Sequence, residues 1–149
     1  MKSYKLLPHT ADTRLYVESD TLAGLFEAAL EGMSNIIKSS PPKAGPPLAE
    51  KIKNRDNKPE IVKGINLTAP DTTSLLIDFL SEVLTYSQEE KAVFRKADIE
   101  KLTDTGLETN VYGKKVDGFD EDIKAVTYHE AEIKKNEKGN YETVIIFDI

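Results

Sequence analysis

The chain has no cysteine and no tryptophan, and aromatic residues make up only 7% of its 149 positions. Without cysteine there is no disulfide framework, zinc-thiolate site, iron–sulfur cluster or thiol nucleophile. The only histidines are His9 and His129, so histidine-based metal sites and acid–base pairs are limited to these two positions. These absences exclude much redox and thiol chemistry.

Long hydrophobic runs are also missing. No stretch approaches roughly 18 consecutive apolar residues, and the N-terminal residues hold no apolar run long enough for a signal peptide. We therefore expect a soluble protein without a membrane partner, in the cytoplasm, a compartment that the absence of cysteine fits. The sequence leaves the oligomeric state open.

Positive charge is in deficit, because Lys and Arg number 20 against 26 Asp and Glu, which gives a formal charge of −6. A molecule of this charge is not an electrostatic nucleic-acid binder, so any contact with RNA would be local or indirect. Common enzyme motifs are absent as well, including glycine-rich phosphate loops, nucleophile elbows and His-Glu-x-x-His helices. Their absence argues against an enzyme that acts alone.

The N-terminal half carries alternating strand and helix patterns. Residues 14–18 alternate polar and apolar side chains, which predicts a half-buried strand. From Asp20, which we take as an N-cap, apolar residues recur at helical spacing and predict a helix to about Lys38. A strand is then expected at residues 61–69, followed by a helix that Asp71 caps and that has one apolar face.

Residues 39–60, between the first helix and the second strand, have a different composition. Four of the seven prolines lie within residues 41–47, where they prevent a helix from continuing. The apolar content is too low to anchor the segment, so we predict a flexible excursion rich in proline and basic residues. Its basic residues could touch RNA, but a solvated loop is the favoured interpretation.

In the C-terminal half the hydrophobic period changes to two. Strand patterns occur at residues 93–101, 107–112, 123–133 and 141–149, with polar, glycine-containing turns between them. Two helices and about six strands predict an α+β fold, with both helices packed on a mostly antiparallel or mixed sheet. We expect a single two-layer domain over residues 1–149.

The last predicted hairpin brings a lysine toward an aspartate. Its turn at residues 138–140 folds the final strand back along residues 123–133, so Lys124 approaches Asp148. The sequence does not fix the register, and a slip of one residue would separate the two side chains. Lys124 could equally be an edge charge on a solvated strand.

Asp148 is the candidate centre of a metal site. It follows an apolar run and precedes Ile149, which adds a free α-carboxylate. Asp12, in the loop before the first predicted strand, is the candidate third carboxylate. Oxygen ligands suit Ca²⁺ or Mg²⁺ rather than zinc. The alternative is that Asp12 is a turn or cap residue and that Asp148 is the end of a fraying strand.

A second acidic group lies just before residue 124. It consists of Asp117, Asp120, Glu121 and Asp122. These residues have no ordered ligand spacing, and we predict a solvated turn.

Three separated motifs together resemble the archease family. They are His9-Thr10-Ala11-Asp12, the segment from Asp122 to His129, and Ile146-Phe147-Asp148-Ile149. They occur in the family's order, with a matching helix after the first, and the resemblance covers nearly the whole chain apart from residues 39–60. It implies a small α+β protein that activates the 3′-phosphate type of tRNA-splicing RNA ligase, promoting guanylylation and multiple turnover without being a ligase itself.

The resemblance also implies functional residues. The family's metal ion, usually taken as Ca²⁺, is held by residues that match Asp12, Asp148 and Ile149. The family's functional lysine matches Lys124, while His9 and His129 belong to the matching motifs as supporting residues. The chain departs from the family in a longer segment at residues 39–60, and in Tyr141 where members often have tryptophan.

Three functions follow from these observations. The first is an accessory protein that binds and activates an RNA ligase through a Ca²⁺-bearing acidic tip, with Mg²⁺ as the alternative ion. The second is a chaperone-like modulator of a tRNA methyltransferase or another RNA-modifying enzyme. The third is a metal-dependent hydrolase in which His9 or His129 serves as base to a metal-bound water, and which would turn over a phosphoester without a partner.

Overall fold

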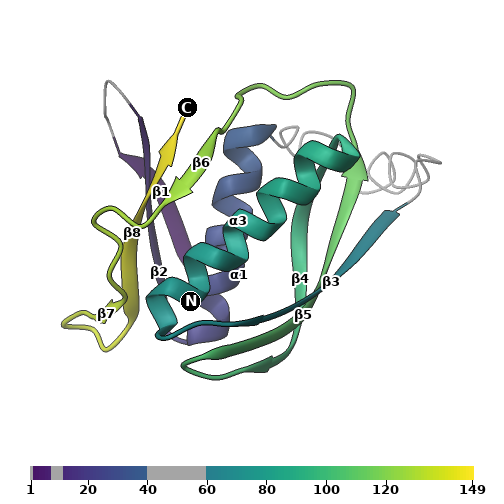
Figure 1. The fold of residues 1–149 in the computed structure, drawn as a ribbon. Helices are drawn as coiled ribbons and strands as arrows, with labels where there is room; N and C mark the ends of the chain where they lie inside the picture. Colours follow the sequence, from purple (N-terminus) through teal and green to yellow (C-terminus); the bar gives the residue numbers. More distant parts are fainter. Residues whose placement is uncertain (1, 8–11, 40–59) are drawn as a thin grey trace, which may run out of the picture.

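The structure is a computed structural model that describes residues 2–7, 12–39 and 60–149 (Figure 1). These residues form eight strands and two helices in the order β1-β2-α1-β3-α3-β4-β5-β6-β7-β8. The predicted α+β class is confirmed. His9 lies outside the described residues, and so does the predicted excursion at 39–60 except for its two end residues.

The larger sheet contains five strands, all paired antiparallel. Its order is β1-β2-β8-β6, and β7 pairs with another part of β8. The strands are β1 (Ser3–Leu7), β2 (Thr13–Ser19), β6 (Ala125–Thr127), β7 (Lys134–Lys135) and β8 (Tyr141–Asp148). The strand predicted at 14–18 is β2, whereas β1 was not predicted, because its alternation covers only four residues and breaks at Leu7.

The smaller sheet contains three antiparallel strands in the order β3-β5-β4. They are β3 (Glu60–Thr68), β4 (Ala92–Leu102) and β5 (Gly106–Lys115). The described residues thus form eight strands in two sheets, where the sequence predicted about six in one.

Helix α1 spans Leu22–Ile37 and begins one residue later than predicted. Thr21, not Asp20, is its N-cap, and the Thr21 hydroxyl accepts a hydrogen bond from the Gly24 N–H at 3.0 Å. The reason is that the backbone stays extended through Thr21 (φ −124°, ψ 154°), which sets this hydroxyl at the first turn.

Helix α3 spans Thr72–Glu90 and has the predicted cap. The Asp71 carboxylate accepts from the Ser74 N–H at 2.7 Å. The helix ends at Lys91 in the left-handed conformation, φ 51°. Neither helix in the described ranges is long and apolar enough to span a membrane.

The two helices lie between the two sheets (Figure 1). Helix α1 contacts β2 on one side and β4 on the other, while α3 contacts β3, β4 and β6. Phe26 of α1 and Phe79 of α3 are fully buried, with ring centroids 5.9 Å apart. Burial of these helix faces supplies the main apolar core that both sheets share.

The predicted strand at 123–133 is wrong as a continuous element. Only β6 pairs at its start, and β7 begins at Lys134 after a turn in which the Ala131 N–H donates to the Tyr128 carbonyl at 3.1 Å. Glu130 has φ 61°, a conformation that a strand cannot hold. The residues between β6 and β7 therefore form no strand, although the Glu132 N–H still donates to the Thr143 hydroxyl of β8 at 3.1 Å.

Candidate functional site

The end of β8 lies between β2 and β6, and this placement brings the two predicted aspartates together. In the ladder between β2 and β8, Thr13 pairs with Phe147. Asp12 directly precedes Thr13 and Asp148 directly follows Phe147, so the two aspartates stand at the same end of this pair of strands. We call Asp12, Lys124, Asp148 and Ile149 the acidic tip.

Lys124 joins the acidic tip from the other side of β8. Its backbone N–H donates to the Asp148 carbonyl at 2.7 Å, while Ala125 is the residue that pairs with Asp148 in the ladder. Lys124 and Ala125 thus both oppose Asp148, an irregularity of the kind found in β-bulges. The ladder partner of Asp148 is thus Ala125, one residue from the pairing considered in the sequence, and it is the backbone of Lys124 that reaches the end of β8.

Exposure differs among the residues of the acidic tip. Asp148 and Lys124 are exposed, whereas Asp12 is half-buried and its Oδ1 atom is buried. Ile149 is half-buried and packs against the core. The fold therefore holds the chain end in place and leaves a carboxylate and an ammonium group open to a partner.

The donor set of the acidic tip fits a hard cation. Within the described ranges, no group of three or more His, Asp or Glu side chains is placed to hold a metal ion. Asp12 and Asp148 supply two carboxylates, so a cation bound here would take its third oxygen group from the Ile149 α-carboxylate. Three carboxylates and no nitrogen or sulfur donor suit Ca²⁺ or Mg²⁺.

His129 lies in the turn after β6, between two anchored residues. The Tyr128 hydroxyl donates a hydrogen bond to the Asp78 carboxylate of α3, which raises the pKa of Tyr128 together with partial burial. On the other side Glu130 forms an ion pair with Arg14 of β2. The His129 side chain itself is exposed. The turn is fixed to both a helix and a strand, so its histidine is presented at a defined place.

Arg14 is a residue near the acidic tip that the sequence did not single out. It stands two residues after Asp12, near the start of β2. Its ion pair with Glu130 ties this end of the strand to the turn that carries His129. In the sequence, Arg14 stands out only as a polar residue in a predicted strand. Its ion pair with Glu130 could not be predicted, because nothing in the sequence around Glu130 indicates a partner in β2.

Solved structures share this fold. A protein of Methanobacterium thermoautotrophicum superposes with a TM-score of 0.67 over 98% of each chain, at 23% identity. A Thermotoga maritima protein, described as an archease and possible chaperone, gives a TM-score of 0.59 over 97% of this chain and 96% of that one, at 18% identity. At these identities the likeness defines the class of fold alone.

Sequence comparison identifies the family. The model of the Archease protein family matches residues 4–149. The protein archease of Methanosarcina mazei is 30% identical, over 99% of this chain and 97% of the relative. That of Pyrococcus abyssi is 28% identical over the full length of both. The chain belongs to the archease family, and the resemblance drawn from its three motifs is confirmed.

Proposed function

We propose that this protein is an accessory factor that activates a tRNA-splicing RNA ligase, promoting its guanylylation and multiple turnover. The observation that carries this proposal is the convergence of Asp12, Lys124 and Asp148, which come from distant parts of the sequence, at the end of one strand in an archease fold. The protein performs no catalysis of its own here. Lys124 is the residue that acts on the partner.

The acidic tip would hold Ca²⁺, or Mg²⁺ as the alternative, through Asp12, Asp148 and the Ile149 α-carboxylate. Such an ion supplies positive charge where carboxylates would otherwise repel one another. Lys124 is exposed beside them, and its flexible stem lets the ammonium group reach a phosphate or a carboxylate on the partner. The backbone hydrogen bond to Asp148 keeps the base of that stem in place.

The net charge supports a protein partner rather than RNA itself. A molecule of charge −6 is attracted to a basic, RNA-handling enzyme and repelled by phosphates. RNA would then be reached indirectly, through the ligase. A cytoplasmic location, where such a ligase would meet its tRNA substrates, remains part of this proposal.

The test is guanylylation and repeated ligation by the RNA ligase from the same source, with and without this protein. We expect the wild type to raise both rates, and Lys124→Ala and Asp148→Asn to lose most of the increase. Lys101→Ala and Asp104→Asn are matched controls, since both residues are exposed and lie away from the acidic tip, and both variants should stimulate normally. An active ligase that the wild type fails to stimulate would contradict the proposal.

The two alternative functions predict other results. A modulator of a tRNA methyltransferase would capture that enzyme in place of the ligase in a pull-down from the source organism. A metal-dependent hydrolase would turn over a phosphoester alone and would lose this turnover in His129→Ala. No observation in the described part of the chain favours either of them.

A further inference from the structure

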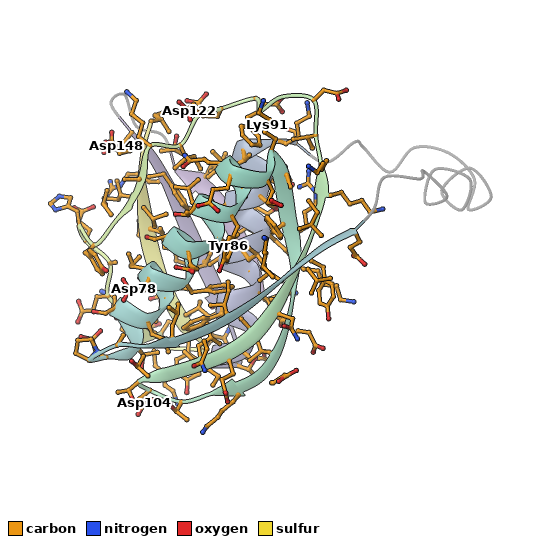
Figure 2. The ribbon with its side chains drawn as sticks, turned by 45° about the vertical axis from the view of Figure 1, so that its right-hand side comes forward. Asp78, Tyr86, Lys91, Asp104, Asp122 and Asp148 are labelled. Atoms are coloured by element: carbon orange, nitrogen blue, oxygen red, sulfur yellow. The ribbon has the colours of Figure 1, made fainter. Side chains whose placement is uncertain are left out.

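The segment that joins β5 to β6 crosses the end of the molecule that carries the acidic tip. We call residues 116–124 the crossing loop; it is the long connection that runs over this end of the molecule between β5 and β6 in Figure 1. In Figure 2, Asp122 of this loop and Lys91 lie at the same end as Asp148, while Asp104 lies at the opposite end. A partner that contacts the acidic tip would therefore also meet the crossing loop.

The crossing loop is held to the fold along its length. The Val116 N–H donates to the Lys91 carbonyl at 2.9 Å, and the Asp120 N–H donates to the Ile37 carbonyl at the end of α1 at 2.7 Å. Further on, Ile123 is buried with 1% of its surface exposed. The loop thus has a fixed shape, and a surface formed on it is preformed for binding.

A groove of about 350 Å³ lies between the crossing loop and the end of α3. Val116 and Phe119 give it apolar walls, and Asp117 and Asp122 place carboxylates on it. The Gln88 amide also lines the groove; its Nε2 donates to the Ile123 carbonyl at 3.0 Å, which leaves Oε1 as an acceptor. The groove therefore combines apolar surface with hydrogen-bond acceptors.

A buried hydroxyl lies beside this groove. Ser87 is only 1% exposed, and its Oγ atom has no hydrogen-bond partner among the described residues. It lines a small cavity of about 10 Å³, which Gln88, Phe119 and Asp122 also line, so the cavity adjoins the groove. This is room for one water-sized group, and an N–H donor placed there would satisfy the buried hydroxyl.

The carboxylates of the crossing loop have different surroundings. Asp120 accepts from the Ser39 N–H at 2.9 Å and lies 3.7 Å from the Lys38 ammonium, and these contacts lower its pKa, the backbone hydrogen bond most. Asp117 and Asp122 form no ion pair with any described lysine or arginine, although Lys91 also lines the groove. The sequence predicted a solvated turn here. In the structure Asp120 anchors the loop, whereas the carboxylates of Asp117 and Asp122 remain for a ligand.

We propose that this groove binds an arginine side chain of the partner protein. The proposal rests on the proposed function, because it takes the partner to be the activated ligase. A guanidinium group is planar and offers five N–H donors, so it stacks on the Phe119 ring while donating to Asp117 and Asp122. Its aliphatic stem matches the apolar wall at Val116. An RNA phosphate is disfavoured, because two carboxylates would repel it.

Binding is tested without the ligase, by following backbone amide NMR signals of the protein during titration with N-acetyl-arginine amide. Because the probe is so small, we expect saturation in the range of about millimolar concentrations, with shifts centred on Gln88, Lys91 and Gly118. N-acetyl-citrulline amide, which has nearly the same shape without the charge, should bind at least about fivefold more weakly. Equal binding of the two probes, or shifts centred elsewhere, would overturn the proposal.

Variants locate the interaction. Asp117→Asn and Asp122→Asn should each weaken arginine binding about fivefold, whereas Asp104→Asn at the other end of the molecule should leave it unchanged. Thermal unfolding of each variant checks that the fold is retained, which we expect because all three side chains are exposed. Unchanged arginine binding in both groove variants would place the ligand elsewhere.

A ligase assay with the double variant Asp117→Asn/Asp122→Asn separates this proposal from the proposed function. We expect the protein concentration for half-maximal stimulation to rise about tenfold or more, with the maximum retained. An unchanged half-maximal concentration would overturn the groove as a partner site, even while stimulation itself supports the ligase proposal. A different outcome is that the groove variants lose arginine binding while the wild-type protein fails to stimulate the ligase. This outcome would support the groove as an arginine site and contradict the ligase as the partner.

Discussion

Asp148 is exposed although the three residues before it, Ile145, Ile146 and Phe147, are buried. Packing in the core accounts for the three apolar residues, but it does not account for a carboxylate at position 148. The sequence predicted that the last hairpin would bring Lys124 toward Asp148, and it offered Asp12 as a candidate third carboxylate without pairing its strand with the last one. It did not predict the ion pair between Arg14 and Glu130, because partners so distant in the chain are set by the tertiary fold.

The first prediction concerns the carboxylates of the acidic tip. Asp12→Asn and Asp148→Asn should each weaken Ca²⁺ binding at least about tenfold, because each removes a charged oxygen ligand. The melting temperature without Ca²⁺ should change little in Asp148→Asn, as this side chain is exposed. Calorimetric titration measures the affinity, with Asp104→Asn as the control. Wild-type affinity in both tip variants would exclude these residues as ligands.

The second prediction concerns Glu18, on the outer side of β2. Hydrogen bonds from the Asn140 and Asn136 side chains lower the pKa of Glu18 below its ordinary value of 4.5. A carboxylate with a lowered pKa in the folded state stabilises the fold above its unfolded pKa, and this stabilisation is lost as the pH falls through the folded value. Glu18→Gln should therefore lower the melting temperature at neutral pH, with a difference from wild type that shrinks toward about pH 3.

Melting curves between about pH 7 and pH 3 measure this dependence. Glu137→Gln is the matched control, since Glu137 is exposed in the hairpin turn that contains Asn136 and Asn140, and its side chain makes no hydrogen bond to a described residue. Its difference from wild type should stay small throughout. A Glu18→Gln difference that is constant with pH would show that the asparagine contacts do not favour the charged carboxylate.

At the scale of elements, the long helices were predictable and the short strands were not. Each helix carries an apolar stripe over several turns, and Asp71 marks the start of α3 as expected. Strand β7 has only two residues, too few to show a period, and the alternation of β1 breaks at Leu7. The division of strands between two sheets depends on which faces the helices cover, and this information is not local in sequence.

Arg95 connects β4 to the C-terminal end of α1, and the third prediction tests this connection. It lies at a register irregularity of β4, and its guanidinium donates to the Lys38 carbonyl at 2.7 Å and to the Asn35 side chain at 3.0 Å. Partial burial of the guanidinium lowers the pKa of Arg95. The contact with Lys38 caps the C-terminal end of α1, one residue from the Ile37 carbonyl that holds the crossing loop.

Arg95→Ala should reduce the free energy of unfolding by about 2 kcal/mol, the scale of hydrogen bonds from a charged donor. Amide hydrogen exchange should also accelerate at Lys38 and Asp120, because the end of α1 and the crossing loop loosen together. Denaturant unfolding and exchange rates provide the two measurements. Lys96→Ala is the control, since the neighbouring Lys96 is exposed. Unchanged exchange at Asp120 would show that the loop does not depend on Arg95.

At the scale of the whole molecule, the groups of the two proposed sites lie at one end. The acidic tip and the groove of the crossing loop lie there together, while Asp104 marks the other end (Figure 2). The sequence predicted the negative charge and the residues of the tip. It did not predict the groove, because Phe119 and Asp122 become its walls only where the loop packs on the end of α3.

The most direct test of the central claim, that Lys124 and Asp148 act on the ligase as one site, is a double-mutant cycle on ligase guanylylation. We expect Lys124→Ala and Asp148→Asn each to lower the stimulated rate about tenfold, as expected for loss of one charge-assisted interaction. The double variant should be little worse than either single variant, because residues of one site are not additive. Undiminished stimulation by the single variants, or losses that multiply in the double variant, would contradict a shared site.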